Sequence, residues 1–193
     1  MAEPYGLFFA DTPRRVEEPG VVGTVKPDIC LFTIRDENQG HITVNFDEQE
    51  DVRDEPYSYF AHMGLVNMFI EVKKESNQDI FTDPPPEGPL PPDYRFTVDT
   101  WSEDESHGHR ISALGRNAHY AHEVLTRQFR ICTFSLTISR RTARIMCWER
   151  SGVLVTEAFD YKTNPRILID FVWRFVNATK FQQSLLTVFV SQL

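Results

Sequence analysis

The sequence predicts a single α+β domain with one mixed or mainly antiparallel sheet and flanking helices. Two observations support this fold class. Strand-like segments come first, and they are followed by an amphipathic helix, three short strands joined by tight turns, and a second helix. The 193 residues are enough for one domain with its own core. We place this domain at residues 25–176, between an irregular lead-in (residues 1–24) and a divergent tail (residues 177–193).

The first half of the domain is expected to supply a hairpin and a central strand. Residues 28–33 and 41–46 are rich in β-branched and aromatic residues and flank a polar turn, which is typical of paired strands. Residues 65–73 are apolar on both faces until their last residues, which indicates a central strand. The next stretch, residues 76–109, is predicted to be a loop insertion that is acidic and rich in proline. Prolines occupy six of the nine positions in residues 84–92, which excludes a helix or an interior strand there.

The second half has clearer periodicity. Residues 110–128 carry apolar side chains at helical spacing, which predicts an amphipathic helix. Three strands are expected to follow as an antiparallel meander, over residues 130–139, 143–149 and 153–159. Asn164 is predicted to cap a final helix whose first residue is Pro165.

Charge is unevenly distributed along the chain. Residues 1–105 carry 8 Lys and Arg against 23 Asp and Glu, whereas residues 106–193 carry 12 against 5. The two halves either pack against each other, or the basic half forms a surface for phosphate, nucleic acid or an acidic partner. The overall charge of −8 argues against tight non-specific binding to nucleic acid. In the second reading, phosphate contacts would come from Arg116, Arg127, Arg130, Arg140, Arg141 and Arg144.

Several classes of protein are disfavoured by the sequence. No apolar run is long enough to span a bilayer, and residues 1–10 do not have the pattern of a signal peptide. The three cysteines are widely spaced and form no Cys-x-x-Cys pair, which disfavours structural zinc and a disulfide framework. We therefore expect an intracellular protein, in the cytoplasm or the nucleus.

Two carboxylates and a lysine form the sharpest candidate site. Pro27-Asp28 on one predicted strand and Glu71-x-Lys73 on the next resemble the pattern of metal-dependent nucleases with the restriction-endonuclease-like fold. Asp28 and Glu71 would supply hard oxygens to Mg²⁺, and the metal would activate a water molecule. Lys73 would orient that water or offset charge in the transition state. The alternative is a strand end where Glu71 and Lys73 simply reach solvent.

The predicted helix adds two residues to this candidate site. Some nucleases of that fold carry Gln-x-x-x-Tyr on the helix after the Glu-x-Lys strand. Here Tyr120 matches, and Arg116 takes the place of the glutamine. One-turn spacing puts both side chains on one helix face. The alternative is an ordinary amphipathic helix with Tyr120 partly buried.

A longer stretch resembles the fungal-type protein kinase family. The resemblance covers residues 26–175 in pieces and is specific over residues 115–175. Three positions depart from the family pattern, with Arg116 for Gln, Phe129 for His and Glu149 for Asp. The matching pieces are residues 26–29 (KPDI), residues 69–73 (FIEVK), Tyr120-Ala121, Arg127-Gln128, Arg130, Phe134-Ser135, Arg144, Trp148, Arg150-Ser151-Gly152, Phe159-Asp160-Tyr161 and the helix LIDFVWRF at residues 168–175.

This resemblance implies the N-terminal module of a kinase-like protein, because the family's kinase portion would follow residue 175. Phosphotransfer needs a Gly-rich loop, a paired strand lysine, a catalytic aspartate and a magnesium-binding aspartate, and the sequence contains no such set of motifs. We therefore expect a regulatory or interaction module without catalytic activity. Its partner would be the kinase portion or another protein. A magnesium-dependent nuclease, active or degenerate, is the alternative.

Overall fold

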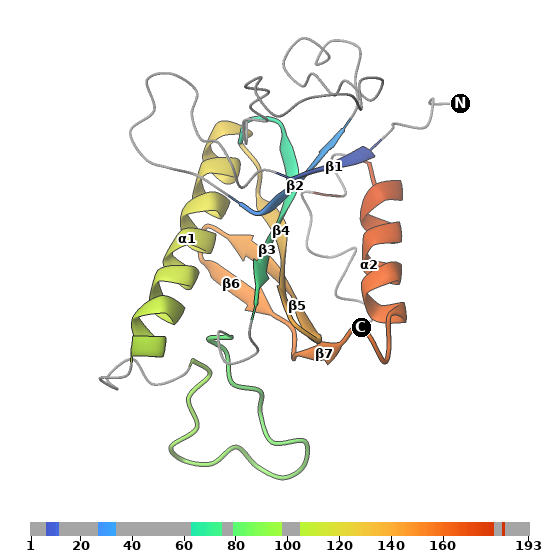
Figure 1. Ribbon diagram of the computed structural model, residues 1–193. Helices are drawn as coiled ribbons and strands as arrows, with labels where there is room; N and C mark the ends of the chain where they lie inside the picture. Colours follow the sequence, from blue (N-terminus) through green and yellow to red (C-terminus); the bar gives the residue numbers. More distant parts are fainter. Residues whose placement is uncertain are drawn as a thin grey trace, which may run out of the picture.

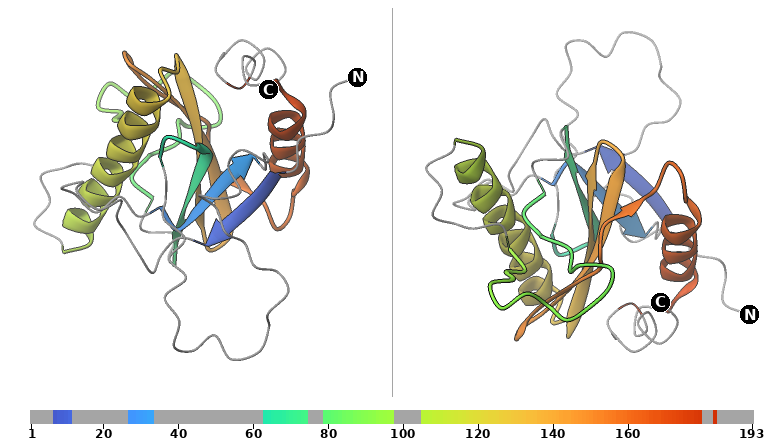
Figure 2. Two further views of the ribbon diagram at one scale, coloured as in Figure 1. Left: turned by 90° about the horizontal axis from the view of Figure 1, so that it is seen from above. Right: turned by 90° about the horizontal axis from the view of Figure 1, so that it is seen from below.

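The computed structural model describes residues 7–11, 27–33, 63–74, 79–97, 105–179 and 183. Over these residues the chain forms one mixed sheet with a helix on each side (Figures 1 and 2). This arrangement confirms the predicted α+β class. The strands are β1 (Leu7–Asp11), β2 (Ile29–Thr33), β3 (Val66–Lys73), β4 (Cys132–Ser139), β5 (Thr142–Glu149), β6 (Gly152–Val155) and β7 (Phe159–Asp160). The helices are α1 (Glu105–Arg127) and α2 (Arg166–Asn177).

The strands follow one another in the sheet in chain order from β1 to β6. All neighbouring pairs are antiparallel except β3 and β4, which are parallel. A parallel pair cannot be joined by a tight turn, because the chain must return to the starting end of the sheet. The segment that contains α1 makes this return. The last strand, β7, pairs with the beginning of β5, beside the part of β5 that pairs with β6.

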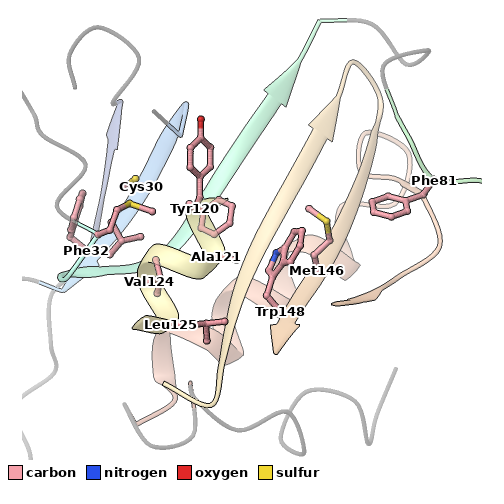
Figure 3. Close-up of a cluster of buried hydrophobic side chains, with 12 residues drawn as sticks. Cys30, Phe32, Phe81, Tyr120, Ala121, Val124, Leu125, Met146 and Trp148 are labelled. Carbon is pink, nitrogen blue, oxygen red and sulfur yellow. The ribbon is translucent and has the colours of Figure 1, made fainter. Parts of the chain in front are cut away.

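The two helices cover opposite faces of the sheet, and each face has its own hydrophobic core (Figure 2). Under α1, Tyr120 and Val124 pack with Trp148 and Met146 from the sheet (Figure 3), and Phe69 belongs to the same cluster. Under α2, the core is a cluster of aromatic rings. It contains Phe134, Phe171 and Phe175, whose ring centroids lie 5.7–6.1 Å apart. The alternation of side chains along each strand divides the residues between these two cores.

Helix α1 begins five residues earlier than the sequence predicted, at Glu105 rather than Arg110. In the sequence, Glu103, Asp104 and Glu105 stand at this position, and negative charge favours a helix N-terminus. At the other end, the predicted strand at Arg130 instead begins at Cys132. Phe129 adopts a left-handed backbone conformation (φ 53°), and the N–H of Arg130 bonds back to the carbonyl of Leu125. These residues end the helix, so they are not available to the strand.

The third strand of the predicted meander is split into two. β6 ends at Val155, and the chain returns to β5 only at Phe159. The carbonyl of Thr156, which lies between them, accepts a hydrogen bond from the buried Arg144 side chain.

The predicted cap of the last helix is also wrong. Pro165 occupies the cap position of α2, and no side chain caps the helix there. The Asp160 carboxylate organises the preceding turn instead of Asn164. It accepts hydrogen bonds from the backbone N–H groups of Thr163 and Lys162, which hold the pKa of Asp160 below its ordinary value.

The proline-rich insertion is a loop in the part that the structure describes, residues 79–97, which we name the strap. It projects beyond the end of the sheet at which β3 ends (Figure 1). Its two stems are tied by a bridge between Phe81 and Thr97 and by a hydrogen bond from the N–H of Thr82 to the carbonyl of Phe96. The Arg144 side chain anchors the first stem through ion pairs with Asp79 and Asp83, at 2.7 Å and 2.5 Å.

Some predictions fall outside the described residues. These are residues 41–46, the rest of the lead-in and nearly all of the tail. The lead-in was wrongly predicted to be irregular at Leu7–Asp11, because this short apolar run forms β1 and extends the sheet beyond β2. The neighbours of β2 in the sheet are therefore β1 and β3, rather than the expected hairpin partner. Within the described residues, neither helix has the length and apolar character needed to cross a membrane. The three cysteines are buried, and none of them forms a disulfide.

Candidate carboxylate site

The structure places Asp28 and Glu71 side by side. Ile29 on β2 is paired with Ile70 on β3, so the preceding Asp28 lies opposite Glu71. Both side chains belong to the face that α1 covers, because Cys30 and Phe69 point into the α1 core and side chains alternate along each strand. The sequence-predicted pair is therefore adjacent in space.

This polar row continues across the sheet. Glu71 is paired with Thr137 on β4, and Thr137 is paired with Arg144 on β5. Asp28, Glu71, Thr137 and Arg144 thus occupy one row on the α1 face. Two residues further along β3 and β4, on the same face, Lys73 is paired with Ser139. Polar residues therefore gather at the end of the sheet from which the strap projects.

Glu71 is held by cations. Its side chain is only 5% exposed, and Oε1 lies 2.5 Å from Lys73 Nζ and 3.6 Å from Arg116 Nη2. The lysine side chain is itself 10% exposed. The second oxygen, Oε2, is buried and has no hydrogen-bond partner among the described residues. A buried carboxylate is costly unless its charge is compensated, and here Lys73 and Arg116 supply that compensation.

Asp28 is also engaged with the protein. Its Oδ2 accepts a hydrogen bond from the backbone N–H of Val72, at 2.7 Å. Val72 lies beyond the last pair between β2 and β3, where no residue of β2 is paired with it. The Asp28 carboxylate therefore caps the end of this ladder, which is a structural role open to any aspartate at a strand end.

The predicted helix face lies directly over β3. Arg116 reaches Glu71, and Tyr120, one turn later, packs against Phe69 with a ring-centroid distance of 5.6 Å and perpendicular rings. Tyr120 is 1% exposed, so it is a core residue rather than partly buried as the alternative reading of the helix held. The two residues thus share a face, as their spacing predicted.

These contacts limit what the site can do chemically. Two carboxylates could share one Mg²⁺, which prefers oxygen ligands and usually keeps several waters. Here one oxygen of each carboxylate already contacts the protein. Within the described residues, no group of three or more His, Cys, Asp and Glu side chains is arranged to hold a metal ion.

The arginines proposed as phosphate contacts are largely used within the domain. Arg127 pairs with Glu123, Arg141 with Asp160, and Arg130 bonds to the side chain and the backbone carbonyl of Asn67. Burial lowers the pKa of Arg130 to about 10, which leaves it charged at neutral pH.

Arg144 was wrongly included among these phosphate contacts, because it is 4% exposed. Its guanidinium bonds to Asp79, Asp83 and two backbone carbonyls. Burial alone would lower the pKa of Arg144, but the hydrogen bonds to the two carboxylates raise it above its ordinary value. Periodicity marked position 144 only as part of a strand, and its partners lie 65 and 61 residues earlier. No local pattern in the sequence could have found this contact.

A second feature that the sequence did not predict is a groove of about 660 Å³ between α1 and the β5–β6 hairpin. Its lining includes Ala121, Leu125 and Trp148. Phe129 also lines the groove, and this side chain is 87% exposed.

Comparisons with known proteins add nothing to this geometry, because no family model, no curated protein and no solved structure matches the chain.

Proposed function

We propose that this domain is a non-catalytic regulatory or interaction module of a fungal-type protein kinase-like protein. The observation that carries the proposal is the state of the carboxylate site. Glu71 is paired with Lys73 and Arg116, and Asp28 caps the backbone at Val72. Among the described residues, the two carboxylates are balanced by two cations, so this part of the site is close to neutral. It resembles a structural ion-pair cluster more than a centre prepared for a divalent cation.

The energetics favour the same reading. A metal ion at Glu71 would have to displace or share Oε1 with the Lys73 ammonium, and that ammonium would then lie close to the added positive charge. Like charges in a buried setting repel strongly. The cluster, by contrast, satisfies the rule that buried charges are paired.

The resemblance to fungal-type protein kinases supplies the protein context. The matching pieces of that family include the strand FIEVK and the helix at residues 168–175, whereas motifs for nucleotide binding and phosphotransfer are missing from the sequence. An interaction role is also supported by the surface of α2. Ile169 and Trp173 lie one turn apart and are 60% and 66% exposed. The three cysteines are buried and form no disulfide, which fits a reducing, intracellular compartment.

A magnesium-dependent nuclease is the second candidate function, and the observation that favours it concerns one oxygen of Glu71. Glu71 Oε2 is buried without a hydrogen-bond partner among the described residues, and a cation bound between Glu71 and Asp28 would satisfy it. The order of elements also suits the restriction-endonuclease-like pattern. Asp28 precedes one strand, Glu71 and Lys73 lie on its neighbour, and the helix that carries Arg116 and Tyr120 follows. In this reading Lys73 would release Glu71 and orient the attacking water.

An activity comparison tests the proposal. The purified chain is incubated with Mg²⁺ or Mn²⁺ and either plasmid and single-stranded DNA, or ATP and a mixture of protein substrates. We expect neither DNA cleavage nor phosphate transfer above the level of Glu71→Gln. Cleavage by the natural chain that is lost in both Glu71→Gln and Lys73→Met would instead establish the nuclease. Phosphate transfer that a point substitution abolishes would contradict both readings.

A further inference from the structure

The strap carries a short motif that the carboxylate site does not use. Residues 90–94 read Leu-Pro-Pro-Asp-Tyr, in which two prolines are followed, after one intervening residue, by an aromatic side chain with a polar tip. We infer that this motif is a docking site for a small domain of the WW type. Such domains hold proline rings in an aromatic-lined groove, and some have a neighbouring pocket for a tyrosine ring. The inference goes beyond the proposed function, and it does not depend on whether Asp28 and Glu71 bind a metal.

The motif is accessible. Pro91, Pro92 and Asp93 are exposed, and Leu90 is 57% exposed. Tyr94 is half-buried. Proline has a fixed φ and no backbone N–H, so an exposed proline segment leaves few unpaired donors and loses little conformational freedom when it binds. These properties explain why proline segments suit aromatic grooves.

The local geometry brings the tyrosine close to the prolines. The N–H of Tyr94 bonds to the carbonyl of Pro91 at 2.9 Å, which closes a turn over Pro92 and Asp93. The Tyr94 hydroxyl donates to the carbonyl of Thr82, at 2.7 Å and at an exposed position. This single exposed hydrogen bond is the contact that docking of the phenol in a partner pocket would replace.

The strap is fixed at its base and presents the motif at its outer part. Arg144 holds Asp79 and Asp83, and the Phe81 and Phe96 rings lie 5.1 Å apart. A segment that is already ordered loses less entropy on binding than a free chain of the same sequence.

The charge of the strap favours one type of partner groove over another. Between Asp79 and Tyr94 the strap has no Lys or Arg, and its one basic residue, Arg95, is exposed after the motif. Glu87 and Asp93 are exposed beside the prolines. Many SH3 grooves add an acidic pocket that holds a basic residue of the ligand, and this strap offers none among its prolines. A WW groove with a basic rim and a tyrosine pocket fits both the charge and the motif.

Binding of the whole chain to a panel of purified WW domains, measured by isothermal titration calorimetry, tests the inference. We expect at least one domain to bind with a dissociation constant of about 100 μM or tighter. The double variant Pro91→Ala/Pro92→Ala and the single variant Tyr94→Ala should each weaken this binding at least about tenfold. The matched control is Pro86→Ala/Pro89→Ala, which removes two exposed prolines of the same strap outside the motif and should leave binding unchanged.

Thermal melts of the four proteins show whether each variant is folded. We expect similar melting temperatures, because all substituted residues lie in the strap. The inference is overturned if no WW domain binds the natural chain, or if both motif variants bind as well as the natural chain does. Equal weakening by the control variant would also overturn it, because a general proline segment would then be the ligand. Binding to a parallel panel of SH3 domains in the absence of WW binding would overturn it as well. Failure in this experiment would leave the proposal for the carboxylate site untouched.

Discussion

Replacing Arg144 with alanine is expected to destabilise the domain by about 3 kcal/mol or more. The guanidinium is 4% exposed and bonds to Asp79, Asp83 and the carbonyls of Phe81 and Thr156. Its removal takes this charged donor away from all four acceptors, and breaking a buried ion pair on one side costs roughly 3–5 kcal/mol. The lower end of this range applies because the Asp83 side chain is 37% exposed and can regain water. For a chain of this size the melting temperature should fall by roughly 6–12 °C.

Arg141→Ala is the matched control for this prediction. Arg141 lies three residues away and pairs with Asp160 at 2.9 Å, but its side chain is 60% exposed. Exposed pairs contribute about 0–1 kcal/mol, so this variant should unfold near the natural midpoint. Urea denaturation of the three proteins measures the difference. Equal midpoints for Arg144→Ala and Arg141→Ala would mean that the strap is not anchored through Arg144.

The second large effect is expected on α2. Phe175 is fully buried, and its ring packs against Phe134 and Phe171 on the α2 face of the sheet. Truncating a buried phenylalanine removes apolar contacts and leaves a cavity, at a cost of about 3–5 kcal/mol. Phe175→Ala should therefore lower the midpoint of urea denaturation much more than the substitution of an exposed residue of α2 does.

Trp173→Ala serves as its control, because it removes a larger side chain two residues earlier in the same helix. Trp173 is 66% exposed, and a surface substitution of this kind usually changes the stability by less than about 0.5 kcal/mol. If Trp173→Ala were as destabilising as Phe175→Ala, the outer face of α2 would have to be covered in solution, for instance by a second copy of the chain.

Local patterns predicted most of the second half of the fold. Helix α1 and strands β4 and β5 follow from residues 110–149, because the apolar side chains change there from helical to strand spacing. The errors fall at element ends. Phe129 adopts a left-handed conformation, which glycine or asparagine would have signalled and phenylalanine does not. Asn164 is a common capping residue, but Asp160 already forms the turn that leads into α2.

The candidate site was predictable as a set of positions, and its internal contacts were not. The sequence placed Asp28 and Glu71 on two strands, and they are neighbours because β2 and β3 pair in a register that sets Ile29 opposite Ile70. Strand spacing also placed Lys73 on the same face as Glu71, but it did not predict that Lys73 would turn back onto the carboxylate. Whether an oxygen of Asp28 points to a backbone N–H or to an open space depends on where the β2–β3 ladder ends, which no residue pattern specifies.

The proline motif can be read from the sequence, but its exposure and the contacts that hold the strap cannot. Residues 84–92 predict a loop from composition alone. Its role as a spacer or a docking segment depends on which residues are exposed and on what holds the stems. The anchoring of Asp79 and Asp83 by Arg144 joins segments more than 60 residues apart, beyond the reach of any local pattern.

The central claim is that Lys73 and Arg116, rather than a metal ion, compensate the charge of Glu71. The most direct test is a thermal-shift titration of the natural chain, Asp28→Asn and Glu71→Gln with Mg²⁺ and Mn²⁺, with NaCl at matched ionic strength as the control. A cation present at about 100 times its dissociation constant would add about 2.7 kcal/mol, or roughly 5–11 °C. We predict no metal-dependent shift in any of the three proteins. We also predict a lower metal-free melting temperature for Glu71→Gln, because the buried Lys73 would lose its carboxylate. A metal-dependent rise in the natural chain that disappears in both variants, with a metal-free Glu71→Gln no less stable than the natural chain, would contradict the account.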